Sequence, residues 1–188
     1  MATTRPLRAD AQRNRDRLLE VAARAFSHDG PDVTLDAIAR EAGVGIGTLY
    51  RHFPTREALV DAAYRNELYR LCDSAERLLK RQPPERALRT WMDRFVDYMG
   101  TKRGMGDALK ALIASGGDPF SESRERLVGA IGTLLEAGAV AGTLRADIDP
   151  EDVLISLSGL SLATADADRR AQAGRLLDLL MDGLRYRG

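Results

Sequence analysis

The apolar residues of this chain recur at the spacing of an α-helix almost throughout. No stretch alternates convincingly between apolar and polar residues, as a half-buried strand would. The first apolar stripe consists of Leu18, Val21, Ala22, Ala25 and Phe26. Glycine and proline breaks such as Gln82-Pro83-Pro84 separate the periodic segments. The pattern predicts an all-α fold of about nine helices, over about residues 15–28, 34–43, 46–53, 55–80, 85–100, 107–114, 127–142, 150–160 and 170–186.

Two of the predicted helices are very short and are separated by a tight glycine turn. Their apolar residues can share one small core: Ile38, Ala39, Val44, Leu49 and Phe53. In a helix-turn-helix built in this way, the second helix enters the major groove of DNA. Its outer face would carry two glycines with hydroxyl and imidazole groups around them. The alternative is a surface hairpin in a protein that never touches DNA.

The charge is balanced overall but unevenly distributed. The 188 residues hold 28 basic and 28 acidic side chains, which by itself argues against a nucleic-acid partner. Residues 1–28, however, hold six arginines against three acidic residues, and residues 1–56 carry a net charge of +2. The remainder carries −2. A mildly basic N-terminal part can therefore bind phosphate while the rest limits non-specific adhesion to DNA.

The same block resembles the DNA-binding domain of the TetR family of transcriptional repressors over about residues 12–62. The matching residues are Arg15-Asp-Arg-Leu-Leu-Glu-Val-Ala-Ala, Phe26, Gly30, Thr34, Ile38-Ala-Arg-Glu-Ala-Gly-Val, Gly47-Thr-Leu-Tyr-Arg-His-Phe and Arg56-Glu-Ala-Leu. The resemblance implies phosphate contacts from Arg15, Thr34, Tyr50, His52 and Arg56. It implies base-edge contacts from Gly45, Ile46, Gly47 and Thr48. Residues 1–56 are thus expected to form the DNA-binding domain, with residues 1–12 as a flexible arm.

Residues 57–188 are expected to form a ligand-binding and dimerisation domain, because Tyr64 to Gly188 is similar to the body of the family and to its SbtR-type subgroup. The resemblance implies a homodimer held by the last two helices, and the predicted interface residues are Leu157, Leu160, Leu177, Leu180, Met181 and Leu184. The alternative is two ordinary buried helices within a monomer. The predicted pocket for a small-molecule effector is lined by Trp91, Phe95, Met99, Met105, Leu109, Leu112 and Phe120. Residues of these types at helical spacing are also typical of plain core.

These features predict a ligand-responsive transcriptional regulator and not an enzyme. It would be a repressor that binds a near-palindromic operator as a homodimer and is released by an effector. No metal or nucleotide cofactor is expected, since His28, His52 and Cys72 lack the spacing of a metal site and no phosphate-binding glycine loop is present. The absence of a signal or membrane segment and the single cysteine favour a cytoplasmic protein without a membrane partner. The alternative function is an all-α small-molecule carrier or hydrolase.

Overall fold

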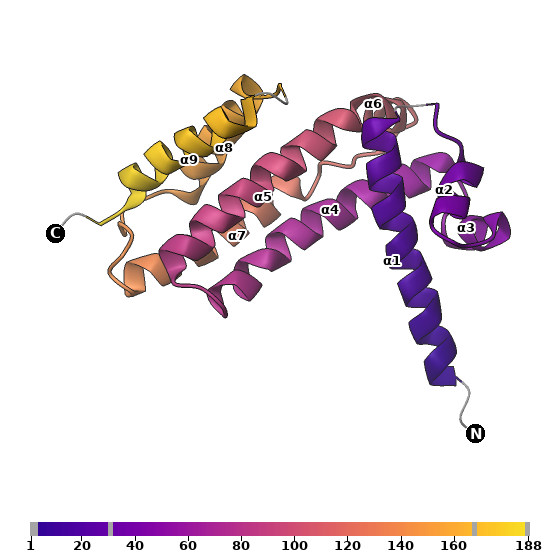
Figure 1. The fold of residues 1–188 in the computed structure, drawn as a ribbon, viewed down its shortest axis with the longest axis horizontal. Coiled ribbons are helices and arrows are strands. Elements are labelled where there is room, and N and C mark those ends of the chain that lie inside the picture. Colours follow the sequence, from indigo (N-terminus) through magenta and orange to yellow (C-terminus); the bar gives the residue numbers. More distant parts are fainter. Residues whose placement is uncertain (1–3, 30–31, 167–168, 187–188) are drawn as a thin grey trace. The chain divides into compact units, whose positions relative to one another are not determined.

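The computed structural model describes residues 4–29, 32–166 and 169–186, and in this part of the chain the predicted all-α class is confirmed. The described residues form nine α-helices and one isolated β-bridge (Figure 1). The helices are α1 (Thr4–His28), α2 (Leu35–Glu41), α3 (Ile46–His52), α4 (Arg56–Leu79), α5 (Pro84–Gly104), α6 (Gly106–Ala114), α7 (Ser123–Val140), α8 (Pro150–Ala163) and α9 (Arg170–Leu184). None of the helices among the described residues combines the length and the apolar character needed to cross a membrane.

Local chemistry sets several helix ends where the sequence predicts them. The Thr34 hydroxyl oxygen accepts a hydrogen bond from the Ala37 backbone N–H at 3.2 Å and caps α2. The Asp149 carboxylate likewise accepts from the Glu151 N–H at 2.8 Å, and Pro150 occupies the first turn of α8. Both predicted N-caps are confirmed.

Other helix ends differ from the prediction. The first helix begins at Thr4, about eleven residues earlier than expected, so residues 4–12 of the predicted flexible arm are helical. Residues 1–3 of that arm lie outside the described residues. Helix α5 continues past Gly100 to Gly104. The apolar stripe predicts only the later turns of α1, whereas the earlier turns contain arginine, glutamine and alanine, which have high helix propensity.

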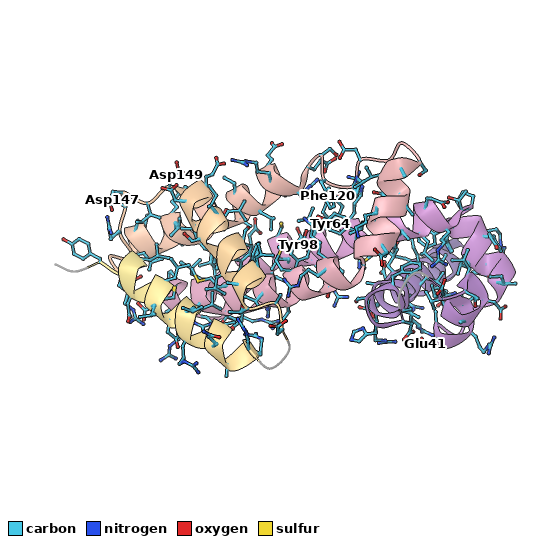
Figure 2. All side chains as sticks on the ribbon, turned by 90° about the horizontal axis from the view of Figure 1, so that it is seen from above. Glu41, Tyr64, Tyr98, Phe120, Asp147 and Asp149 are labelled. Carbon is cyan, nitrogen blue, oxygen red and sulfur yellow. The ribbon has the colours of Figure 1, made fainter. Side chains whose placement is uncertain are left out.

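The C-terminal end of α9 is fixed by pairing with the segment between α7 and α8. Leu144 and Arg185 form the antiparallel β-bridge, and the Tyr186 N–H donates to the Thr143 carbonyl at 3.1 Å. The helix therefore ends at Leu184, short of the predicted residue 186. Figure 2 shows Asp147 and Asp149 on the same connecting segment.

The chain divides by packing into two compact units. The first comprises Met1–Glu67 with Thr101–Pro119, and the second comprises Leu68–Gly100 with Phe120–Gly188. Within the first unit the end of α5 approaches the end of α1 very closely, because a Cβ at Gly104 would lie 2.4 Å from the Ser27 carbonyl oxygen. This division crosses α4 and α5, unlike the predicted functional boundary after residue 56, which stays a prediction.

The second unit has an aliphatic core around a cluster of three aromatic side chains, Trp91, Phe95 and Tyr98. Trp91 is fully buried, and its Nε1–H donates to the Leu71 carbonyl at 3.0 Å, which ties α5 to α4. The Phe95 ring stacks on Trp91 with the ring centroids 5.8 Å apart. Helix α9 is held to α5 by Arg89, which pairs with Asp178 at 2.8 Å. Helices α8 and α9 lie side by side at the C-terminal end of the chain (Figure 1).

Candidate nucleic-acid interface

A shared core in the first unit fixes helices α2 and α3 against α1. The residues at the centre of this core are fully buried: Leu18, Leu19, Phe26, Ile38 and Leu49. The turn between α2 and α3 depends on Gly43, whose φ of +69° is a left-handed conformation that suits glycine. Arg17 donates to the Ala42 carbonyl at 3.3 Å, and Arg24 pairs with Glu41, which Figure 2 shows at the end of α2. The two short helices therefore form one rigid helix-turn-helix.

The solvent-facing side of α3 is nearly bare backbone. Gly45 and Gly47 are exposed, and a Cβ built on either would meet no atom of this chain within 4 Å. Neither glycine has a positive φ. Gly45 is the N-cap of α3, a position that favours glycine. Gly47 lies inside α3, where folding gives no reason for glycine, and it lowers the intrinsic stability of the helix by about 1 kcal/mol relative to alanine. The smallness of the two residues instead permits close approach by a partner.

Apolar and hydroxyl-bearing side chains surround this bare strip. Ile46 is 37% exposed and Tyr50 is 49% exposed, although both are large and apolar. Because they are four residues apart, they are neighbours on the helix surface. Thr48 is half-buried on the same short helix. The predicted base-contacting residues therefore lie together at the exposed start of α3.

Arg51 is a candidate that the sequence analysis missed. Its Nη2 donates to the Thr48 Oγ1 at 3.1 Å, and its Nε donates to the Gly47 carbonyl at 3.2 Å. The guanidinium therefore lies along α3 beside the predicted base-contacting residues. The signal was present in the sequence, since Arg51 is three and four residues from Thr48 and Gly47 and so shares their side of the helix.

The predicted phosphate contacts divide into exposed and packed groups. Thr34 is exposed, and its capping role uses only the hydroxyl oxygen, so its O–H can still donate. The Arg15 guanidinium lies 5.6 Å from the centroid of the Phe53 ring, and the His52 ring lies 6.1 Å from it. Arg56 is more deeply involved in the fold: its Nη1 donates to the Val33 carbonyl at 2.5 Å, and its guanidinium lies 4.8 Å from the Phe26 ring centroid.

The residues of the predicted effector pocket occupy core positions in both units. Trp91, Phe95, Met105, Leu109 and Leu112 are buried, whereas Met99 and Phe120 are half-buried. Met105, Leu109 and Leu112 belong to the first unit and the other four to the second. Whether they hold a ligand stays a prediction.

A separate surface hollow of about 570 Å³ lies at the C-terminal end of α9. Its charged groups pair with one another, Arg145 with Asp147 and Arg185 with Asp182. The two hydrogen bonds from Arg145, at 2.7 and 2.9 Å, lower the pKa of the Asp147 carboxyl. The ion pairs favour a structural role for this hollow.

The predicted dimer residues are mostly part of the core of the second unit. Leu157, Leu177, Met181 and Leu184 are at most 4% exposed, while Leu160 and Leu180 are half-buried. The large apolar side chains that α8 and α9 leave exposed are different ones. They are Ile155, Leu162 and Leu179, with exposed fractions of 60%, 72% and 68%.

The described residues contain no group of three or more His, Cys, Asp or Glu side chains that could hold a metal ion. The single cysteine, Cys72, is half-buried in α4. Burial raises the pKa of its thiol to about 11, and the neighbouring Asp73 carboxylate adds to the shift. A thiol with so high a pKa is protonated and unreactive near neutral pH.

The fold and the exposed face of α3 define a helix-turn-helix DNA-binding protein. Residues 18–63 match the family model described as "Bacterial regulatory proteins, tetR family", and residues 83–186 match "Transcriptional regulator SbtR-like, C-terminal domain". The chain belongs to the TetR family of transcriptional regulators.

Solved structures and curated sequences agree with this family. A TetR transcriptional regulator from Streptomyces coelicolor is 55% identical, with 93% of this chain and 99% of that one covered and a TM-score of 0.89. The TetR transcription regulatory protein from Mycobacterium vanbaalenii is 38% identical, with 96% and 100% covered and a TM-score of 0.78. A curated HTH-type transcriptional regulator from Staphylococcus aureus is 43% identical over 54 residues. That match covers 28% of this chain and only 29% of the length of the curated relative.

Proposed function

We propose that this regulator is a homodimeric repressor that binds a near-palindromic operator and releases it when a small-molecule effector binds. The observation that supports it best is the open face of α3, where Gly45 and Gly47 have no role in packing and Ile46 and Tyr50 are exposed. Two such helices, one from each subunit, would enter successive major grooves. The half-site centres would lie about 34–36 Å apart for one helical turn, or a multiple of that distance.

The proposed DNA contacts assign different tasks to the residues around α3. Base edges are met by Gly45, Ile46, Gly47 and Thr48, and phosphates by Arg15, Thr34, Tyr50, His52 and Arg56. Arg51 is added as a further contact because its guanidinium already lies along the exposed side of α3. Phosphate contacts position the helix, whereas base-edge contacts select the sequence.

The proposed dimer surface is centred on the exposed apolar side chains of α8 and α9, namely Ile155, Leu162 and Leu179, and it includes the half-buried Leu160 and Leu180. Exposed apolar side chains of this size on adjacent helices favour association with another protein surface. A second copy fits because an isologous interface places the same patch of both subunits in contact.

The proposed effector acts by binding to the predicted ligand-binding domain, residues 57–188, and is not converted chemically. A ligand releases the operator only if it binds the dimer more tightly when its two DNA-binding domains are arranged so that they cannot bind the operator. A ligand that binds both arrangements equally does not shift the equilibrium between them. The apolar side chains around Trp91 and Phe95 are the proposed lining, with Met99, Met105, Leu109, Leu112 and Phe120.

Selection of binding sites from a random pool of duplexes, followed by binding isotherms over a range of salt concentrations, tests the proposal. We expect one enriched motif with two inverted half-sites and an affinity that falls as salt rises, because each neutralised phosphate releases counterions. Enrichment of a single half-site bound by monomers would contradict the dimer. Failure to enrich any motif would contradict binding to a specific operator. Repression is tested separately by measuring the activity of a promoter that contains the selected site, and equal activity with and without the protein would contradict it.

A further inference from the structure

The side chains on the exposed side of α3 are poorly suited to reading bases by hydrogen bonds. From Gly45 to His52 the sequence contains no Asn, Gln, Asp or Glu, the residues that pair with adenine or cytosine edges. Arg51 has the geometry to pair with guanine, but its guanidinium donates to its own helix at Gly47 and Thr48. Thr48 and Arg51 are thus among the few hydrogen-bonding groups on this part of α3, and they leave room for a second source of sequence discrimination.

Ile46 supplies an apolar one. Its neighbours in the chain, Gly45 and Gly47, have no side chains, so the Ile46 side chain is flanked by bare backbone at the start of α3. It is 37% exposed, whereas Leu49 and Phe53 of the same motif are buried. Tyr50, one turn later, extends the apolar surface with its ring.

The major groove offers one apolar group that differs between bases, the C5-methyl group of thymine. The two glycines let the α3 backbone approach the base edges closely enough for a side chain as short as Ile46 to reach that methyl group. Burial of the methyl against Ile46 would remove apolar surface of both from water.

We propose that Ile46 selects thymine in each half-site through contact with the thymine C5-methyl group. This inference rests on the proposed binding of α3 in the major groove, and it adds the chemical feature of the DNA that is recognised.

Replacement of single thymines by deoxyuridine tests the contact, because it removes the methyl group and leaves the base-pairing atoms in place. The full-length protein and its selected operator are used, with the dissociation constant measured at one fixed salt concentration. We expect one thymine per half-site at which deoxyuridine weakens binding about fourfold, and about fifteenfold when both half-sites are changed.

Ile46→Ala is the variant that assigns the effect. It should bind the thymine and deoxyuridine operators equally, whereas Ile113→Ala, which removes an isoleucine 46% exposed on α6, should keep the wild-type difference. Circular dichroism melts check that both variants fold. No sensitive thymine in the wild-type protein, or a sensitivity that survives Ile46→Ala, would overturn the inference while sequence-specific binding stands. If the wild-type protein shows no sequence-specific binding at all, the proposed function itself is refuted.

Discussion

Gly47→Ala should make the protein more stable and a poorer DNA binder. Gly47 lies inside α3, is exposed, and has open space where a Cβ would stand. Alanine is favoured over glycine in a helix by about 0.8–1.0 kcal/mol, which for a chain of this size raises the melting temperature by about 2–4 °C. In the groove, however, the added methyl group would meet the DNA at the point of closest approach. An overpacked contact costs about 1–3 kcal/mol, so affinity for the operator should fall by a factor of about 5 to 150.

Two other glycines provide matched controls. Gly129 is exposed in α7 and also has nothing within 4 Å of its Cβ position, so Gly129→Ala should stabilise the protein similarly and leave DNA binding unchanged. Gly43 has a φ of +69°, so Gly43→Ala should lower the free energy of unfolding by about 1–2 kcal/mol. Thermal unfolding and fluorescence anisotropy on a labelled operator measure both quantities for all three variants.

A Gly47→Ala variant that is more stable but binds the operator as tightly as the wild type would show that the glycine does not serve close approach. A destabilised Gly47→Ala variant would show that the space around the Cβ position is not open.

Three further predictions follow from contacts of individual side chains. Arg56→Ala should lower the free energy of unfolding by about 1–2 kcal/mol, because it removes a hydrogen bond to a backbone carbonyl and a cation–π contact. The slope of log affinity against log salt should also fall by about one unit, and an altered base preference would contradict the phosphate role. The double variant Leu162→Glu with Leu179→Glu should sediment as a folded monomer and bind the operator weakly, whereas Ile113→Glu should still dimerise. Finally, Cys72 should react slowly with a disulfide reagent at pH 8 and faster as the pH approaches 11, where the thiolate forms. Rapid modification at pH 8 in the folded protein would refute its burial.

Much of the fold could be predicted because apolar spacing and cap residues act locally. Thr34 and Asp149 each have a side-chain oxygen in front of an apolar stripe, and both cap a helix as predicted. The ends that differ lie where no local signal exists. The early start of α1 at Thr4 involves turns without an apolar stripe, and the end of α9 at Leu184 depends on pairing with residues some forty positions earlier.

The candidate site shows the same limit. The exposed face of α3 could be predicted because Leu49 and Phe53 identify the buried side of a short helix. The packing of Arg56 against Phe26 and Val33 could not, because these residues are distant in sequence. The division of α9 into core and surface was also hidden. Leucines cover most of that helix, and only its packing shows that Leu177 is buried while Leu179 is exposed.

The close contact between Gly104 and Ser27 has a consequence for building hybrid regulators. A hybrid that joins residues 1–56 of this chain to the body of another regulator would leave out Thr101–Pro119, which packs in the same unit as the N-terminal helices. It would also place a residue of the other regulator at the position of Gly104, next to the Ser27 backbone, where there is no room even for a Cβ atom. The DNA-binding domain therefore cannot be transferred as residues 1–56 alone, and a working hybrid must also include the end of α5 and all of α6 from this chain.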